Sequence, residues 1–293
     1  MRIANAWSDY EIIDSSRGEK LERWGDVLLV RPDPQIIWNT EHISPLWQKA
    51  DARYIRSAAG GGEWEEYHMS KKQWTVHYKS LAFKVSPTGF KHTGLFPEQA
   101  VNWDYCAEKI KAARLADPKH PIKVLNLFAY TGGATLACAA AGAEVCHVDA
   151  SKGMVSWARE NSRLSGLEAK PIRWIVDDCQ KFVERELRRG SFYDAVIMDP
   201  PSYGRGPGGE VWKLEEQIYD LVKLAAGVLS KNALFFMLSS YTTGLPTSVM
   251  EYLLGVTVGS GRAGEVSSSE IGLPVSESGY NLPCGSTAVW QSK

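Results

Sequence analysis

The chain has 293 residues, a formal net charge of −1, 44% hydrophobic and 23% charged residues, which is the composition of an ordinary globular protein. This length suffices for one large domain or for two. The near-neutral net charge does not indicate broad nucleic-acid binding, although a local basic patch is compatible with a net charge near zero. Neither a run of roughly 20 apolar residues nor an N-terminal apolar segment is present, and the five scattered cysteines form no CxxC pair. We therefore expect a cytoplasmic protein without a disulfide framework or a metal site.

Residues 1–90 are β-like and predict a small β-rich N-terminal domain. The candidate strands are Tyr10–Ile13, Val27–Arg31 and Gln35–Trp38. Two further apolar runs, Trp74–Tyr78 and Leu81–Val85, are separated by two residues and predict a hairpin.

Residues 91–293 alternate between strand and helix patterns, after a first helix from Glu98 to about Leu115. The predicted strands are Val124–Phe128, Glu144–Val148, Ile172–Val176, Ala195–Met198 and Ala233–Leu238, and the predicted helices are Gly133–Ala141, Lys152–Leu164, Cys179–Arg188, Trp212–Leu229 and Ser248–Leu254. Such alternation predicts an α/β domain built from βαβ units on a parallel sheet. The tail from Gly264 to Trp290 predicts two final strands joined by a turn near Gly279.

The first candidate binding segment is the strand-to-helix junction VLNLFAYTGG, residues 124–133. Glycines at such a junction let backbone approach a ligand and aim the helix N-terminus at it, but they also suit an ordinary tight turn. Phe128, Ala129 and Tyr130 stand where a pyrophosphate cradle needs glycine, which argues against a dinucleotide.

Carboxylates follow the next two predicted strands. Asp149 comes 17 residues after Gly132 and can accept both ribose hydroxyls of an adenosine group, or alternatively cap the next helix. In Asp177-Asp178-Cys179, one carboxylate can take an adenine amino group and the other can cap a helix. Cys179 is interpreted as a packing residue rather than a nucleophile.

The most informative segment is Asp199-Pro200-Pro201-Ser202-Tyr203-Gly204, directly after a buried strand. Two prolines can continue neither a sheet ladder nor a helix, so the chain turns at the carboxyl end of the strand, where open α/β sheets bind ligands. An acceptor, a backbone carbonyl between prolines and an aromatic face can together hold a planar amine in line with a reacting group.

These four segments, in this order, resemble class I S-adenosylmethionine-dependent methyltransferases, and more narrowly the bacterial large-subunit rRNA methyltransferases that include cytosine-C5 and guanine-N7 enzymes. The resemblance extends from about residue 80 to the end and includes the segments KHTGLFPEQ (91–99), NLFAYTGG (126–133), VDAS (148–151), ARENSRLSGL (158–167), VDD (176–178) and DPPSYG (199–204). It implies a Rossmann-like class I methyltransferase sheet with a terminal antiparallel hairpin over residues 91–293, and S-adenosyl-L-methionine as cofactor.

The resemblance also implies roles for individual residues. Phe96, Gln99, Tyr130 and Thr131 would lie near the methionine moiety of the cofactor, with Phe128 and Ala129 in the same loop. Asp149, Ala150 and Ser151 would lie at the ribose, and Asp178 and Cys179 at the adenine. Asp199, Pro200, Pro201 and Tyr203 would face the substrate, with Asp199 also beside the cofactor.

One departure from the family pattern concerns the chemistry. Methylation at cytosine C5 requires a cysteine that adds to the ring, because that carbon is not nucleophilic by itself. Where the C5 enzymes carry this cysteine, after the fifth strand, the present chain has Ser239 and Ser240. We therefore expect transfer to a nitrogen.

Three functions remain open at this point. The leading one is methylation of a base nitrogen in RNA, with rRNA as partner and no membrane or metal. The second is methylation of a protein or small molecule, and the third is a cofactor-binding scaffold without catalysis. Candidates for an RNA-binding strip are Lys71, Lys72, Trp74, His77 and Lys79, although a solvated hairpin face is the favoured explanation for them.

Overall fold

The computed structural model describes residues 1–57, 61–89, 91–205, 211–242 and 244–293. Its contacts divide the chain into two compact units. Unit 1 comprises residues 1–101 and 271–284, and unit 2 comprises residues 102–270 and 285–293. The domain boundary predicted between residues 90 and 91 stays a prediction. The predicted N-terminal domain did not include residues 271–284, which belong to unit 1.

Unit 2 is built on a mostly parallel sheet. Its strands are β9 (Lys123–Leu127), β10 (Glu144–Asp149), β11 (Ile172–Val176), β12 (Ala195–Met198), β15 (Phe235–Ser240) and the C-terminal part of β17 (Asn281–Ser292). With the N-terminal part of β16 (Gly264–Pro274) beside β17, the order is β16-β17-β15-β12-β9-β10-β11, and β17 runs antiparallel to β15. From β9 the chain adds β10 and β11 toward one edge of the sheet. It then returns to the other side of β9, where it adds β12 and β15 toward the opposite edge. The carboxyl ends of β9 and β12 therefore mark the topological switch point, where this fold class binds ligands.

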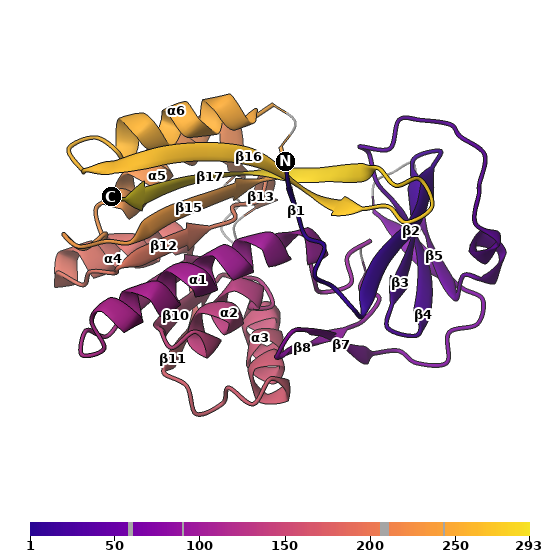
Figure 1. The fold of residues 1–293 in the computed structure, drawn as a ribbon, viewed down its shortest axis with the longest axis horizontal. Coiled ribbons are helices and arrows are strands. Elements are labelled where there is room, and N and C mark those ends of the chain that lie inside the picture. The colour runs from indigo at the N-terminus through magenta and orange to yellow at the C-terminus, as the bar shows by residue number, and fades with distance from the viewer. Residues whose placement is uncertain (58–60, 90, 206–210, 243) are drawn as a thin grey trace. The chain divides into compact units, whose positions relative to one another are not determined.

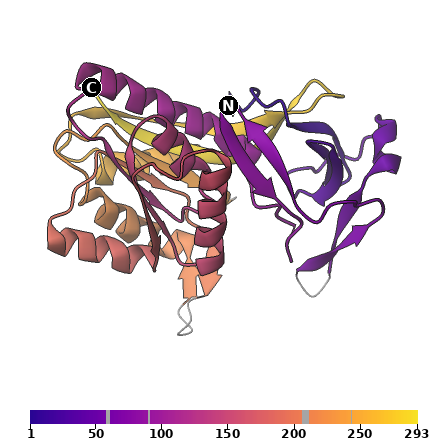
Figure 2. The same ribbon diagram turned by 90° about the horizontal axis from the view of Figure 1, so that it is seen from below.

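Helices cover both faces of this sheet (Figures 1 and 2). Figure 1 shows α1 (Ala100–Ala116), α2 (Gly133–Ala140) and α3 (Lys152–Leu164) on one face, and α4 (Cys179–Arg189), α5 (Leu214–Ala226) and α6 (Thr247–Thr257) on the other. Successive strand residues point to opposite faces of the sheet. Leu125 packs with α4–α6, whereas Val124 packs with α1 and α2. The predicted Rossmann-like α/β fold is confirmed.

Unit 1 is β-rich, as predicted. A five-stranded sheet has the order β2-β3-β4-β5-β6, and β7 pairs with β8 in a separate hairpin. The strands are β2 (Tyr10–Ser16), β3 (Glu19–Trp24), β4 (Val27–Pro32), β5 (Ala52–Arg56), β6 (Gly62–Glu66), β7 (Trp74–Tyr78) and β8 (Leu81–Val85), and two short 3-10 helices are η1 (Pro45–Lys49) and η2 (Pro97–Gln99). Arg17 and Gly18, both at positive φ, form the tight two-residue turn that joins β2 to β3.

Two sequence predictions for unit 1 need correction. The segment Gln35–Trp38 is turn and irregular backbone rather than a strand, because it follows Pro32 and Pro34 and its first residue closes a turn on Asp33. The strand β3 was not predicted, since its charged residues Lys20 and Glu22 conceal that it is buried.

The terminal hairpin is present as predicted. β16 spans Gly264–Pro274, and the turn before β17 includes Gly279 at a φ of +69°. The boundary between the two units falls inside both strands. Within unit 1, the short strand β1 (Arg2–Ile3) pairs in parallel with Ile271 and Gly272 of β16.

Among the described residues, no helix is long and apolar enough to cross a membrane. The same part of the chain holds no group of three or more His, Cys, Asp or Glu side chains that could bind a metal ion.

Candidate active site

The candidate site of unit 2 is the row of loops at the carboxyl ends of its parallel strands. The loop after β9 contains two non-glycine residues in the left-handed region, Phe128 at a φ of 55° and Tyr130 at 49°. Such conformations cost free energy and persist only where the surroundings fix them, which often happens at ligand sites. Here the fixing contacts are hydrogen bonds from the Phe128 N–H to the Cys179 sulfur, at 3.3 Å, and from the Tyr130 N–H to Asp149, at 2.9 Å.

Asp149 accepts hydrogen bonds from the backbone of two loop residues. Its Oδ2 accepts the Tyr130 N–H and its Oδ1 accepts the Ser151 N–H, at 2.8 Å. Burial raises the pKa of Asp149, and the two N–H groups counter this effect. The capping alternative for Asp149 is excluded, because the N-cap of α3 is Ser151, whose hydroxyl accepts the Met154 N–H. Each carboxylate oxygen has a second lone pair, so Asp149 retains acceptor capacity toward a ligand.

The residues after β11 divide between two structural roles. Asp178 caps α4 by accepting the Lys181 N–H at 2.9 Å, and Asp177 forms an ion pair with Arg185. Cys179 is buried, and burial raises the pKa of its thiol. A protonated buried thiol is a poor nucleophile, which agrees with the packing role predicted for it.

The two glycines of the first loop serve packing as well as conformation. Gly132 has a φ of +91° at the N-terminus of α2. A Cβ on Gly133 would lie only 2.4 Å from the ring of Trp103 on α1. The bare backbone at Gly133 therefore admits the indole of Trp103.

The segment after β12 turns back as predicted and forms a small platform. Tyr203 begins β13 (Tyr203–Arg205), which pairs with β14 (Val211–Lys213). The Trp212 indole donates a hydrogen bond to the Pro201 carbonyl at 2.5 Å, and the Ser202 carbonyl accepts the Leu214 N–H at 3.1 Å. Tyr203 is 52% exposed.

Trp212 is a site residue that the sequence did not reveal. Its ring lies 6.3 Å from that of Phe128, between centroids, and so joins the loop after β9 to the platform after β12. The sequence pattern placed Trp212 inside a helix, whereas α5 begins at Leu214. Glu215 and Glu216, acidic residues typical of a first helical turn, were the signal that could have placed the start correctly.

Neither serine after the fifth parallel strand is poised as a nucleophile. Ser239 is 2% exposed and hydrogen-bonds with Asn102 and Thr287. The Ser240 hydroxyl accepts the Thr242 N–H at 3.1 Å. Both hydroxyls therefore take part in structural hydrogen bonds.

Other predicted site residues have different settings. Phe96 and Gln99 belong to unit 1, where Phe96 precedes η2 and Gln99 ends it, and their contact with a cofactor stays a prediction. The candidate RNA-binding strip is largely neutralised by acids, because Lys71, Lys72 and His77 pair with Asp26, Glu66 and Asp9. Trp74 is buried.

Comparison with known proteins agrees with this geometry. Residues 48–220 match the model of a family described as S-adenosylmethionine-dependent methyltransferases. A crystal structure of the SAM-dependent methyltransferase from Agrobacterium tumefaciens aligns with a TM-score of 0.92 at 38% identity, covering 100% of this chain and 93% of that one.

Two further relatives are more distant or match only in part. The ribosomal RNA large subunit methyltransferase K/L of Shewanella baltica is 34% identical over 145 residues, which are 49% of this chain and 19% of that protein. The match thus spans about a fifth of the length of this curated relative. The Pyrococcus abyssi tRNA (uracil-54, C5)-methyltransferase, solved with S-adenosyl-L-homocysteine, shares the fold with a TM-score of 0.50 at 16% identity, covering 93% of this chain and 59% of that one.

The family match covers more than half of the chain, and the matched residues include the loops after β9, β10, β11 and β12. The chain therefore belongs to the S-adenosylmethionine-dependent methyltransferases.

Proposed function

We propose that the protein transfers the methyl group of S-adenosylmethionine to a nitrogen of an RNA base, in ribosomal RNA. The observation that carries this proposal is the Asp199-Pro200-Pro201 turn, which ends β12 at the topological switch point of the sheet. The proposal is supported by the rRNA methyltransferases among the relatives, whose sequences match part of this chain.

The residues around the switch point suit the cofactor. Asp149 offers a carboxylate with remaining acceptor capacity, as ribose hydroxyls need. The rings of Phe128 and Trp212, which lie near each other, offer apolar surface. We assign the methionine end to Tyr130 and Thr131, and the adenine to the backbone and side chains of Asp178 and Cys179. Cofactor contact by Phe96 and Gln99 stays a prediction. Bound S-adenosylmethionine supplies a methyl group on a positively charged sulfur.

Transfer to nitrogen follows from the nucleophiles that the chain offers. A carbon acceptor in a pyrimidine needs a covalent partner, and the buried Cys179 with its raised pKa cannot easily supply a thiolate. Ser239 and Ser240 are engaged in structural hydrogen bonds. A base nitrogen already carries its own lone pair, so it needs only orientation and removal of a proton, tasks that suit Asp199 and the exposed ring of Tyr203.

The ribose contact can be tested by Asp149→Ala. Because this change removes the proposed acceptor of two hydroxyls, S-adenosylhomocysteine binding should weaken by roughly 1.5–3 kcal/mol, measured by calorimetric titration. Asp194→Ala, which removes a buried carboxylate that accepts the Lys123 N–H outside the candidate site, is the matched control and should lower stability with little change in affinity. Unchanged affinity in Asp149→Ala would leave Asp149 a purely structural residue.

The substrate can be tested by comparing rRNA nucleosides from wild-type and deletion strains by mass spectrometry. We expect one N-methylated nucleoside to disappear and to return when the purified protein is supplied with the deletion-strain RNA. Loss of 5-methylcytidine instead would contradict nitrogen transfer. Unchanged rRNA, with methyl label entering protein or a small molecule, would contradict the RNA assignment.

A further inference from the structure

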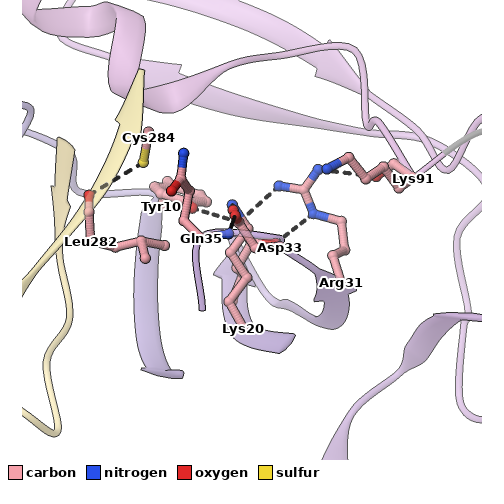
Figure 3. Close-up of polar contacts among 9 residues, drawn as sticks. Tyr10, Lys20, Arg31, Asp33, Gln35, Lys91, Leu282 and Cys284 are labelled. Atoms are coloured by element: carbon pink, nitrogen blue, oxygen red, sulfur yellow. Dashed lines mark hydrogen bonds and ion pairs between the residues drawn. The ribbon is translucent and has the colours of Figure 1, made fainter. Parts of the chain in front are cut away.

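The polar side chains buried in the two units differ in kind. In unit 1 they include a group of charges, in which the fully buried Glu22 accepts hydrogen bonds from Arg31 at 2.8 Å and from the Tyr10 hydroxyl at 2.6 Å, with the Lys20 ammonium 3.5 Å away (Figure 3). In unit 2 neutral side chains are buried against the loop after β9, and Asn161 on α3 bonds directly to the backbone of that loop. Asn161 therefore adjoins residues that we assign to the cofactor.

Asn161 holds one end of the peptide group between Thr131 and Gly132. Its side chain is fully buried, and its Nδ2 donates a hydrogen bond to the Thr131 carbonyl at 2.9 Å. At the other end of the same peptide group, the Gly132 N–H donates to the Ala129 carbonyl at 3.0 Å. Because this peptide is held at both its oxygen and its hydrogen, it cannot rotate without breaking a hydrogen bond.

The helix that carries Asn161 packs closely on this part of the loop. Gly132 has a φ of +91°, and a Cβ built on it would lie 3.0 Å from the Cβ of Ala158. Ala158 and Asn161 are three residues apart on α3 and so share one face of the helix. Thr131 is only 1% exposed, so a donor at its carbonyl oxygen avoids the cost of an unsatisfied buried acceptor.

The helical turn that follows the loop is anchored separately. Thr135, in the first turn of α2, accepts a hydrogen bond from Asn126 Nδ2 at 2.9 Å and bonds to His147 Nδ1 at 2.9 Å. Asn126 on β9 and His147 on β10 are paired in the sheet, and burial lowers the pKa of His147 to about 3, so the imidazole is neutral at neutral pH. Loss of the Asn161 amide should therefore release the Thr131–Gly132 peptide while α2 stays attached to the sheet.

We propose that Asn161 is a positioning residue for methyl transfer, which fixes the backbone of Thr131 where it receives the methionine end of S-adenosylmethionine. This role rests on the assignment of Thr131 to that end of the cofactor, which is part of the proposed function. The ribose and the adenine are assigned instead to Asp149, Asp178 and Cys179, which follow other strands. Asn161 should therefore affect ligands that carry the amino-acid group of the cofactor, and not ligands that lack it.

The test compares S-adenosylhomocysteine with 5′-methylthioadenosine, which keeps the adenosine and the sulfur but lacks the amino-acid group. Asn161→Leu keeps roughly the volume of the side chain and removes its donor. Calorimetric titration of the whole chain should show S-adenosylhomocysteine bound about 10-fold more weakly, because a loop acceptor loses its donor, and 5′-methylthioadenosine bound as in the wild type. Asn161→Ala, which cannot crowd the loop, should show the same selective loss and replaces Asn161→Leu should that variant not fold.

Two control variants separate positioning from stability. Asp194→Ala should lower the melting temperature and leave both affinities unchanged, since Asp194 accepts the Lys123 N–H at the opposite end of β9 from the loop. Asp149→Ala should weaken both ligands alike, because both carry the ribose.

Equal loss of both ligands in the Asn161 variants would overturn the positioning role. Full affinity for S-adenosylhomocysteine in Asn161→Leu would also overturn it, because the volume of the side chain would then suffice without its donor. If the wild type bound the two ligands equally, the result would instead contradict the assignment of Thr131 to the methionine end.

Discussion

Asp199→Ala is expected to abolish methyl transfer while leaving cofactor affinity within a few-fold of the wild type. The side chains proposed to hold the cofactor in unit 2 follow β9, β10 and β11, whereas Asp199 follows β12. In the proposed mechanism its carboxylate orients the acceptor nitrogen and takes its proton, an interaction that matters in the transition state more than in the ground state. Loss of a positioned acid or base costs typically 10²–10⁴-fold in rate, so single-turnover transfer to deletion-strain RNA should fall by about that factor.

Asp199→Asn and Ser239→Ala sharpen this experiment. Asp199→Asn keeps the size of the side chain but cannot accept a proton, so it should be nearly as slow as the alanine variant. Ser239→Ala removes a buried structural hydroxyl and should lower stability more than rate. If a folded Cys→Ser variant were inactive while Asp199→Ala remained active, a covalent carbon mechanism would replace nitrogen transfer.

Glu22→Gln is expected to destabilise the protein by about 3–5 kcal/mol, because it leaves the buried Arg31 and Lys20 charges without their anion. Urea unfolding at neutral pH measures this loss directly. Glu19→Gln, on the same strand, breaks a pair between Glu19 and the more exposed Arg53, and should cost only about 0.2–1 kcal/mol. Equal losses in the two variants would show that burial of the Glu22 charge carries no special weight.

The same group predicts acid sensitivity. Arg31 and Lys20 hold the pKa of Glu22 at about 2, below its ordinary value of 4.5. A lowered folded-state pKa means that the stabilisation is complete above pH 4.5 and is lost progressively as pH falls from 4.5 toward 2. The unfolding free energy of Glu22→Gln should therefore depend less on pH in that window than that of the wild type.

Regular elements of unit 2 could be predicted closely from the sequence. α3, β11 and β12 have the predicted bounds, because each has a clear apolar period and a polar cap or turn beside it. In unit 1 the β7–β8 hairpin was equally clear. β3 was not, since Lys20 and Glu22 are buried only because partners on other segments neutralise them, and such pairing is invisible in a local pattern.

The candidate site shows the same contrast. That Asp149 and Asp199 lie at the carboxyl ends of parallel strands in one sheet followed from the alternation of strands and helices. The left-handed backbone at Phe128 and Tyr130 did not, because non-glycine residues adopt it only when tertiary contacts such as those to Cys179 and Asp149 hold it. The approach of Trp212 to Phe128 joins residues far apart in sequence and needed the fold itself.

Unit 1 is formed from two separate stretches of the chain, and this has a consequence for synthesis on the ribosome. Its first 101 residues emerge early, but its β16–β17 hairpin, residues 271–284, follows about 170 residues later. At about 5–20 residues per second that interval is about 10–30 s. Until then the edge strand β2 lacks the hairpin that bonds to the Ile12 and Ile13 carbonyls, and an uncovered strand edge invites pairing with other chains. Unit 1 is thus completed only after most of unit 2 has been made.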